Sequence, residues 1–299
     1  METKYVISVV GPTAIGKTTL SLKLAEAFNT EIISADSRQF YKEIPIGTAA
    51  PTTEELRKAT HHFIHNRSIE EDYSVGDFER EALVVLDQIF ETHQFAIVVG
   101  GSGLYIKALL EGLDNFPEIE STIREQLNDT FTTEGLEPLQ LQLKQLDPEY
   151  YSKIDVQNPH RVIRALEICI GTGKTFSSFL AHPKPQRSFN VISVGLDAPR
   201  AVIYDRINLR VDAMMDEGLL EEAQALYPKR RLNALNTVGY KELFSFFEGR
   251  IDLETAVEEI KMNSRRYAKR QLTWFRKNKE TKWFNYKTSF QEIKDFIAS

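Results

Sequence analysis

The hydrophobic pattern at the start of the chain alternates between short apolar runs and a helical periodicity. Continuous, β-rich apolar runs occur at Tyr5–Val10, Glu31–Ser34 and Phe95–Val99, and glycine or polar residues follow each of them. Such runs are typical of strands that are buried on both faces of a parallel sheet. Residues Lys17–Phe28, between the first two runs, have the spacing of a helix. The order of strand, glycine loop, helix and strand predicts the opening of an α/β domain.

The pattern changes between residues 116 and 187. Strand candidates are absent there, and apolar residues such as Leu136, Leu139 and Leu143 recur three or four positions apart. This spacing is typical of the buried face of a helix. We therefore expect a core of residues 1–115 and 188–299 that is interrupted by an all-helical insertion of residues 116–187.

The strand pattern returns after the insertion. Phe189–Gly195 predicts another buried strand, and a long helix is expected from about Pro199. Most of the remaining sequence has helical spacing, and Lys282–Tyr286 predicts a last strand. The second half of the core thus extends the α/β pattern of the first half.

Composition and charge are those of an ordinary globular protein. The 299 residues include 42% hydrophobic residues, 37 Lys and Arg, and 43 Asp and Glu, for a formal net charge of −6. This mixture excludes collagenous, low-complexity and wholly disordered chains. Cys169 is the single cysteine, so it has no partner for an intramolecular disulfide, which fits a reducing compartment. No apolar run approaches the ~20 residues of a membrane span, and the first residues do not resemble a signal peptide. We expect a cytoplasmic protein without a membrane partner.

A glycine-rich loop directly after the first predicted strand carries a specific motif. The sequence GPTAIGKT, residues 11–18, matches the pattern G-x-x-x-x-G-K-[ST] in its required context of strand and helix. Glycines allow backbone N–H groups to point at phosphate oxygens, and the start of the helix adds its positive dipole end. Lys17 supplies a full positive charge, and the hydroxyl of Thr18 is of the kind that holds Mg²⁺. The predicted phosphate-binding residues are Gly11, Thr13, Ala14, Ile15, Gly16, Lys17 and Thr18.

The position of the acidic residue distinguishes this chain from most nucleotide-hydrolysing proteins. Those proteins carry an aspartate after a buried strand to organise magnesium, but Gly100, Gly101 and Ser102 follow the 95–99 run here. The acid is Asp36, after the second predicted strand. Ligands of open parallel sheets bind beyond the carboxyl ends of the strands, so Asp36, Ser102 and the phosphate loop should face one crevice. This set fits a transferase with a phosphorylated donor, in which Asp36 accepts a proton from the acceptor. A helix cap is the alternative role for Asp36.

Seven motifs, in order over nearly the whole chain, resemble those of the tRNA dimethylallyltransferases, the IPP transferase family. They are GPTAIGKT, SADSRQFY, PIGTAAP, VVGGSGLYIKALLEG, NPHRVIRALEI, TVGYKE and RRYAKRQLTWFR. The resemblance implies a P-loop NTPase-like parallel sheet flanked by helices, with the insertion as a tRNA-binding domain. It implies transfer of a dimethylallyl group from dimethylallyl diphosphate to the exocyclic amine of the adenine 3′-adjacent to the anticodon. Diphosphate is released, and Mg²⁺ is required. The chain is similar to the compact bacterial form.

The resemblance assigns roles to the residues of the crevice. Asp36 corresponds to the general base, and Lys17 with the loop amides would stabilise charge on the leaving diphosphate. Ser102 stands where the family usually has threonine, and either hydroxyl can bond the leaving oxygen. Arg210 matches a diphosphate-contacting arginine, and Arg206 lies one helical turn earlier on the same face. A surface salt bridge is the alternative role for both arginines.

Contacts with the tRNA anticodon stem-loop are expected from the turn that begins at Asp36, from the insertion and from residues 261–279. The last segment has eight Lys or Arg and no Asp or Glu, with aromatic residues interleaved. Cations neutralise phosphates, and aromatic rings stack on unpaired bases, although charge runs also occur on solvated helix faces. The residues expected to contact tRNA are Asp36, Ser37, Arg38, Gln39, Ser102, Arg124, His160, Arg161, Arg164, Lys269, Arg270, Trp274 and Arg276.

Three other functions remain open. An isopentenyltransferase acting on free adenine nucleotides would not need the insertion or the basic segment. A small-molecule kinase can also carry a phosphate loop with an aspartate after the second strand. A non-enzymatic RNA-binding module would leave the phosphate loop and Asp36 unexplained.

His61, His62 and His65 lie close together, but the sequence offers no third convergent ligand, so we expect no metal there. We expect a monomer.

Overall fold

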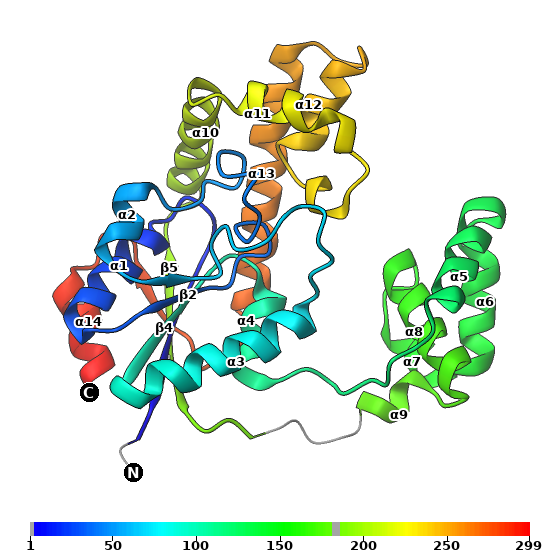
Figure 1. Ribbon diagram of the computed structural model, residues 1–299, viewed down its shortest axis with the longest axis horizontal. Coiled ribbons are helices and arrows are strands. Elements are labelled where there is room, and N and C mark those ends of the chain that lie inside the picture. The colour runs from blue at the N-terminus through cyan, green and yellow to red at the C-terminus, as the bar shows by residue number, and fades with distance from the viewer. Residues whose placement is uncertain (1–2, 181–185) are drawn as a thin grey trace. The chain divides into compact units, whose positions relative to one another are not determined.

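The computed structural model describes residues 3–180 and 186–299 and consists of two compact units (Figure 1). The core unit contains residues 1–111 and 187–299, and the helical unit contains residues 112–186. The boundaries expected from sequence were 116 and 187. The first differs because α4, which packs in the core unit, ends at Glu111.

The core unit is built on a six-stranded parallel sheet in the order β3-β2-β4-β1-β5-β6. The strands are β1 (Tyr5–Val10), β2 (Ile32–Ser34), β3 (His61–His62), β4 (Phe95–Val99), β5 (Asn190–Asp197) and β6 (Lys282–Asn285). The predicted α/β class is confirmed. The sequence analysis missed β3, because a two-residue edge strand of histidines has neither length nor apolar character.

Helices cover both faces of this sheet (Figure 1). The helices of the core unit are α1 (Lys17–Phe28), α2 (Thr53–Lys58), α3 (Val75–Thr92), α4 (Gly103–Glu111), α10 (Arg200–Asp216), α11 (Leu219–Leu226), α12 (Tyr240–Phe247), α13 (Leu253–Phe275) and α14 (Phe290–Ala298). Successive residues of a strand point to opposite faces. Val6 therefore packs with Phe78 and Leu109 of α3 and α4, whereas Ile7 packs with Leu24 and Ile203 of α1 and α10. No described helix combines the length and apolar character needed to cross a membrane.

A third hydrophobic cluster joins the helices α10–α13, which lie above the sheet in Figure 1. Its centre is Tyr240, which is fully buried among residues such as Leu219 and Ile260. This cluster anchors α10 and α13, the two helices that supply side chains to the site described below.

The helical unit has a core of its own. Its helices are α5 (Ser121–Glu134), α6 (Glu137–Leu146), α7 (Pro148–Lys153), α8 (Pro159–Thr172) and α9 (Phe176–Leu180). Leu139 and Leu143 of α6 pack against Val162 and Leu166 of α8. The fully buried carboxylate of Asp147 accepts hydrogen bonds from the backbone N–H groups of Tyr150 (3.0 Å) and Ser177 (2.7 Å), which ties α7 to α9.

Candidate active site

The phosphate loop lies between β1 and α1, as the sequence predicts. Gly11 and Gly16 have φ angles of 143° and 107°, a region that side chains disfavour. Lys17 begins α1, and its Nζ donates hydrogen bonds to the carbonyl oxygens of Gly11 (3.1 Å) and Pro12 (2.8 Å). The lysine therefore ties its own end of the loop to the end that follows β1.

Burial and a neighbouring cation lower the pKa of Lys17 to about 8. Burial has the larger effect, and the Arg210 guanidinium adds to it, while the Asp36 carboxylate opposes both. Arg210 is itself buried, and burial lowers its pKa against the opposing effect of Asp36. A polyanion between these cations would stabilise their charged forms.

Two arginines of α10 reach the phosphate loop. Arg206 donates to the carbonyl oxygen of Ile15 (3.1 Å), and Arg210 donates to the hydroxyl of Thr13 (3.1 Å). Arg210 also donates to the carbonyl oxygen of Ala49 (3.2 Å). Neither arginine forms an ion pair within the described residues, so the surface salt bridge is not their role in this structure. The geometry places two cations beside the loop amides.

Asp36 follows β2 at the edge of the sheet where the phosphate loop lies. Its Oδ1 accepts a hydrogen bond from the backbone N–H of Arg38 (3.2 Å). The following residues form a turn and not a helix, so the helix-cap alternative was wrong. The other oxygen, Oδ2, points towards Gly101: it lies 3.2 Å from the position that a Cβ of this glycine would take.

Ser102 connects the turn after β2 with the turn after β4. Its Oγ accepts from the backbone N–H of Ser37 (2.9 Å) and donates to the Ser37 hydroxyl (3.0 Å). The two turns can approach because residue 100 is glycine: an added Cβ would lie 2.2 Å from the carbonyl oxygen of Ala35. The structure thus brings Asp36, Ser102 and the phosphate loop together at one edge of the sheet.

Two residues of α13 were missed by the sequence analysis, which treated this helix only as an RNA surface. Gln271, which is 4% exposed, accepts from the backbone N–H of Thr13 (2.8 Å) and donates to the carbonyl oxygen of Gly101 (3.0 Å). Tyr267 donates to the same carbonyl oxygen (3.3 Å), and burial raises the pKa of its hydroxyl. The sequence did contain a signal for them. Tyr267 and Gln271 are uncharged and lie four positions apart in an otherwise cationic segment, which indicates that they share a buried face of the helix.

Two cavities meet at these residues. The phosphate-loop cavity, of about 650 Å³, is lined by residues 13–18, Asp36, Gln39, Arg210 and Gln271, among others. The second cavity, of about 560 Å³, is lined on its far side by Arg38, Asn263 and Arg270. The residues that line both are Thr13, Asp36, Thr48, Arg210, Met214 and Tyr267. Asp36 therefore faces two compartments, one with the phosphate loop and one with Arg38 and Arg270.

The remaining core residues expected to contact tRNA have mixed surroundings. Lys269 and Arg270 are exposed on α13, and Trp274 is 37% exposed. Arg276 pairs with Asp197 (2.5 Å). Arg38 donates to the carbonyl oxygen of Asn233 (3.0 Å), and Gln39 holds the carbonyl oxygens of residues 48 and 49.

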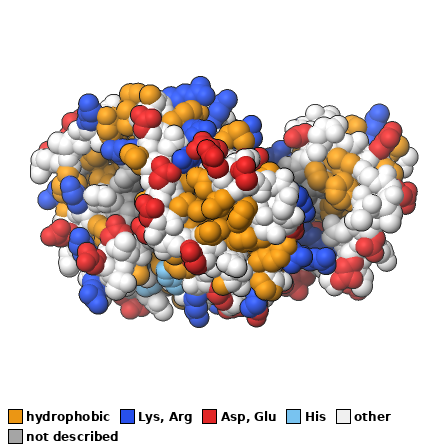
Figure 2. All heavy atoms as spheres, turned by 90° about the horizontal axis from the view of Figure 1, so that it is seen from above, with side chains coloured by type: hydrophobic (Ala, Val, Ile, Leu, Met, Phe, Trp, Pro, Cys, Tyr) orange, Lys and Arg blue, Asp and Glu red, His pale blue; other side chains and the backbone are white. Residues whose placement is uncertain are grey.

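The basic segment 261–279 is not one continuous cationic face. Lys261 is mostly buried and pairs with Asp212 (2.8 Å), and Arg265 donates to Asn208 (2.6 Å). On the face of the molecule drawn in Figure 2, Lys and Arg side chains lie beside Asp and Glu side chains. The eight charges in the sequence are therefore divided between packing contacts and exposed positions.

The helical unit carries the other residues expected to contact tRNA. His160 and Arg161 are exposed in the first turn of α8. Arg164 and Arg124 lie 3.1 Å and 3.9 Å from the buried carboxylate of Glu167. These two arginines therefore compensate a buried charge, in addition to any contact with RNA.

The three histidines have separate surroundings. Nδ1 of His61 lies 2.8 Å from the carbonyl oxygen of Ala59, and Nε2 of His62 lies 2.5 Å from the Glu31 carboxylate. His65 lines the phosphate-loop cavity. Within residues 3–180 and 186–299, no three His, Cys, Asp or Glu side chains converge as a metal site would require.

Comparisons with known proteins agree with this architecture. A family model described as IPP transferase matches residues 39–278. The tRNA dimethylallyltransferases of Christiangramia forsetii and Flavobacterium johnsoniae are 61% and 56% identical to this chain, over 99% of its length and 98% and 97% of theirs. The crystal structure of a tRNA isopentenylpyrophosphate transferase from Bacillus halodurans has a TM-score of 0.74 at 38% identity and covers 99% of this chain and 96% of that one. A eukaryotic dimethylallyltransferase described as acting on tRNA has a TM-score of 0.83 at 26% identity, over 99% of this chain and 80% of that one. The chain belongs to the IPP transferase family.

Proposed function

We propose that this protein transfers a dimethylallyl group from dimethylallyl diphosphate to the exocyclic amine of the adenine 3′-adjacent to the anticodon of tRNA. The observation that carries the proposal is the position of Asp36 at the junction of two cavities. One cavity offers a cradle for a diphosphate, and the other offers arginines for an RNA. The family membership supports the same reaction.

In the proposed step the adenine amine attacks the first carbon of the dimethylallyl group. The new N–C bond forms as the C–O bond to diphosphate breaks, and the diphosphate leaves with the electron pair. The proton of the amine goes to the carboxylate of Asp36, whose Oδ1 is held by Arg38 N–H. Ser102, whose hydroxyl accepts a hydrogen bond from the N–H of Ser37 in the lining of the second cavity, would bond the acceptor or the leaving oxygen.

The charge that develops on the leaving diphosphate would be stabilised by the loop amides, Lys17, Arg206 and Arg210. Preorganised donors of this kind need little rearrangement during reaction and usually contribute a large share of catalysis. Lys17 now bonds two loop carbonyl oxygens, and it would exchange them for diphosphate oxygens. Burial lowers the pKa of Lys17, and a bound anion would raise it again.

The donor set is suited to Mg²⁺. This ion keeps several water ligands and commonly binds through one or two protein oxygens plus substrate phosphates, so a cage of three protein carboxylates is not required. Thr18 lines the phosphate-loop cavity, and its hydroxyl with the diphosphate oxygens would hold the ion. When bound, Mg²⁺ neutralises charge on the leaving group.

The acceptor is proposed to be a tRNA anticodon stem-loop, which we expect the protein to meet in the cytoplasm as a monomer. The second cavity would receive the target adenine between Arg38 and Arg270. Exposed Lys269 on α13, with His160 and Arg161 in the helical unit, would neutralise backbone phosphates. A flipped, unpaired base is the usual substrate of enzymes that modify bases.

The test is incubation with labelled dimethylallyl diphosphate, Mg²⁺ and unmodified tRNA. Label at the adenine beside the anticodon is the expected result. Label only in free adenine nucleotides would indicate the nucleotide-specific transferase, and phosphate transfer from ATP without prenyl transfer would indicate a kinase; either result contradicts the proposal.

A variant tests the role of Asp36 in the same assay. Asp36→Asn keeps an oxygen for the Arg38 N–H but removes the base, so the single-turnover rate should fall by about 10²–10⁴ while donor binding persists. Asp252→Asn, at the exposed N-cap of α13 and outside both cavities, serves as the matched control. An unchanged rate in Asp36→Asn would remove this residue from the mechanism.

A further inference from the structure

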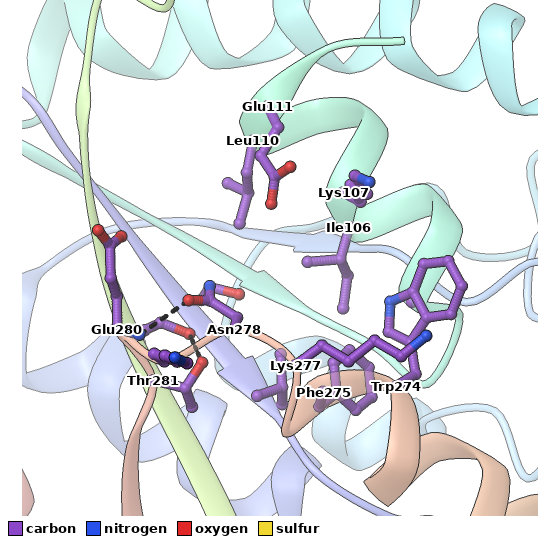
Figure 3. A pocket seen from close by; sticks show the side chains of 15 residues that line it. Ile106, Lys107, Leu110, Glu111, Trp274, Phe275, Lys277, Asn278, Glu280 and Thr281 are labelled. Carbon is purple, nitrogen blue, oxygen red and sulfur yellow. Dashed lines mark hydrogen bonds between the residues drawn. The ribbon is translucent and has the colours of Figure 1, made fainter.

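A third cavity, of about 510 Å³, shares no lining residue with the two cavities of the site. Figure 3 shows it between α4, with Ile106 and Lys107, and the end of α13, with Trp274 and Phe275. The loop that follows α13 forms the remaining side. Nothing in the reaction proposed above uses this space.

The floor of this cavity is a row of hydroxyls on the sheet. Ser8 of β1 and Ser193 of β5 are paired in register, and the Ser193 hydroxyl bonds that of Thr281 (2.9 Å). Ser8 is fully buried, and its Oγ has no hydrogen-bond partner. A buried hydroxyl without a partner is costly, and a valine would pack better on this face of the sheet. A ligand with a polar edge in this cavity would give the Ser8 hydroxyl a partner.

The residues of the walls and the rim limit the class of ligand that the cavity can bind. Ile106, Leu110 and Phe275 provide apolar walls, and Lys107 and Lys277 stand at the rim (Figure 3). The lining also includes the carboxylates of Glu111 and Glu280 and the side chain of Lys279. A cavity with apolar walls, hydroxyls on the sheet and three lysines fits a nucleobase whose phosphate lies at the lysines. Bases stack on apolar and aromatic side chains irrespective of sequence, and hydroxyls can serve as donor or acceptor to any base edge.

The location of the cavity favours RNA over a free nucleotide. Trp274, partly exposed at its edge, lies on the same helix as the exposed Lys269 and Arg270. Gly103, which also lines it, directly follows Ser102 and packs against Trp274: an added Cβ would lie 2.2 Å from the indole. The cavity is thus separated from the site by the first residue of α4.

We propose that this cavity, the hydroxyl pocket, receives a second unpaired nucleoside of the RNA whose adenine is modified. The proposal rests on the function proposed above. A second base outside the stack would hold the loop of the RNA open while the target adenine lies in the second cavity.

The test uses anticodon stem-loop RNAs with a single abasic nucleotide at each loop position other than the target. With the wild-type protein, one abasic position should raise the KM for RNA about tenfold, the usual scale for loss of one stacked base. Ser8→Val removes the hydroxyl and fills part of the pocket, so this variant should bind the intact RNA about tenfold more weakly. The abasic nucleotide that raises the KM of the wild type should not raise the KM of Ser8→Val any further. The KM for dimethylallyl diphosphate should not change.

Lys277→Glu at the exposed rim provides a second variant that does not depend on packing, with the exposed Lys287→Glu as its matched control. Lys277→Glu should weaken RNA binding and reduce the same abasic effect, whereas Lys287→Glu should behave as wild type. Identical abasic profiles in wild type and both pocket variants would overturn the hydroxyl pocket while prenyl transfer continued. If the wild type binds these RNAs without transferring the prenyl group, the proposed function fails. The affinities of wild type and variants for the set of abasic RNAs would then still show whether the hydroxyl pocket binds a base.

Discussion

Gln271 is the residue whose replacement tests most directly whether α13 positions the site. Its side-chain amide joins the phosphate loop, through the Thr13 N–H (2.8 Å), to the turn after β4, through the Gly101 carbonyl (3.0 Å). Gln271→Leu keeps the size of the side chain and removes both hydrogen bonds. The two turns that carry Lys17 and Ser102 then lose their common support.

The expected magnitudes follow from these contacts. Each neutral hydrogen bond contributes about 1 kcal/mol net, so Gln271→Leu should lower the free energy of unfolding by about 2 kcal/mol. The loss of unfolding free energy does not exceed this value, because neither remaining group is left buried without a partner. The Gly101 carbonyl keeps its hydrogen bond from the Tyr267 hydroxyl (3.3 Å), and Thr13 lines an open cavity. A displacement of reacting groups by about 1 Å can cost about 10²-fold in rate, and we expect a loss of that order in kcat.

The assay is single-turnover prenyl transfer to an anticodon stem-loop, with urea unfolding of the same samples. Thr30→Val is the matched control, because Thr30 is buried and bonds the Phe95 carbonyl at the opposite end of the strands. Thr30→Val removes one hydrogen bond, so it should lower the free energy of unfolding by about 1 kcal/mol and keep its rate. Gln271→Glu adds a distinctive signature: a protonated carboxylic acid offers the same acceptor and donor as the amide, so its activity should recover as pH falls. Two results together would show that Gln271 does not position the site. Gln271→Leu would be destabilised but keep the wild-type rate and donor affinity, and the activity of Gln271→Glu would not change with pH.

Three further outcomes are expected. Lys17→Ala should weaken the binding of dimethylallyl diphosphate in equilibrium titration, and unchanged affinity would contradict its assigned role. Joint replacement of Lys269 and Arg270 by alanine should reduce the slope of log affinity for tRNA against log salt concentration by about one unit per lost phosphate contact. An unchanged slope would show that this part of α13 does not contact the RNA. Burial lowers the pKa of His61, against the opposing effects of its bond to the Ala59 carbonyl and of Glu55. Below about pH 6.5 the unfolded chain then binds more protons than the native one, so urea stability should fall between pH 7 and 5, less steeply in His61→Gln.

The order of elements could be predicted because the relevant signals are local. Tyr5–Val10 is apolar at every position except Ser8, as expected of a strand buried on both faces. The phosphate loop is a contiguous motif whose backbone conformation depends on its own glycines. Asp36 and Ser102 could be placed at one edge because all parallel strands end there. His61 and His62, in contrast, form a strand only by pairing with β2, which no local pattern indicates.

The sequence alone was enough for the class of fold and the family, since these depend on spacing within short segments; the residues that it assigned to the chemistry stay a prediction. Only the tertiary structure decided that Gln271 and Tyr267 belong to the site, that Lys261 and Arg265 are engaged in packing, and that an unpartnered hydroxyl of Ser8 lines a separate pocket. The physical reason is the same in each case. Hydrogen bonding and burial depend on which segments meet in space, and a helix such as α13 presents different residues to the core and to solvent whatever their charge.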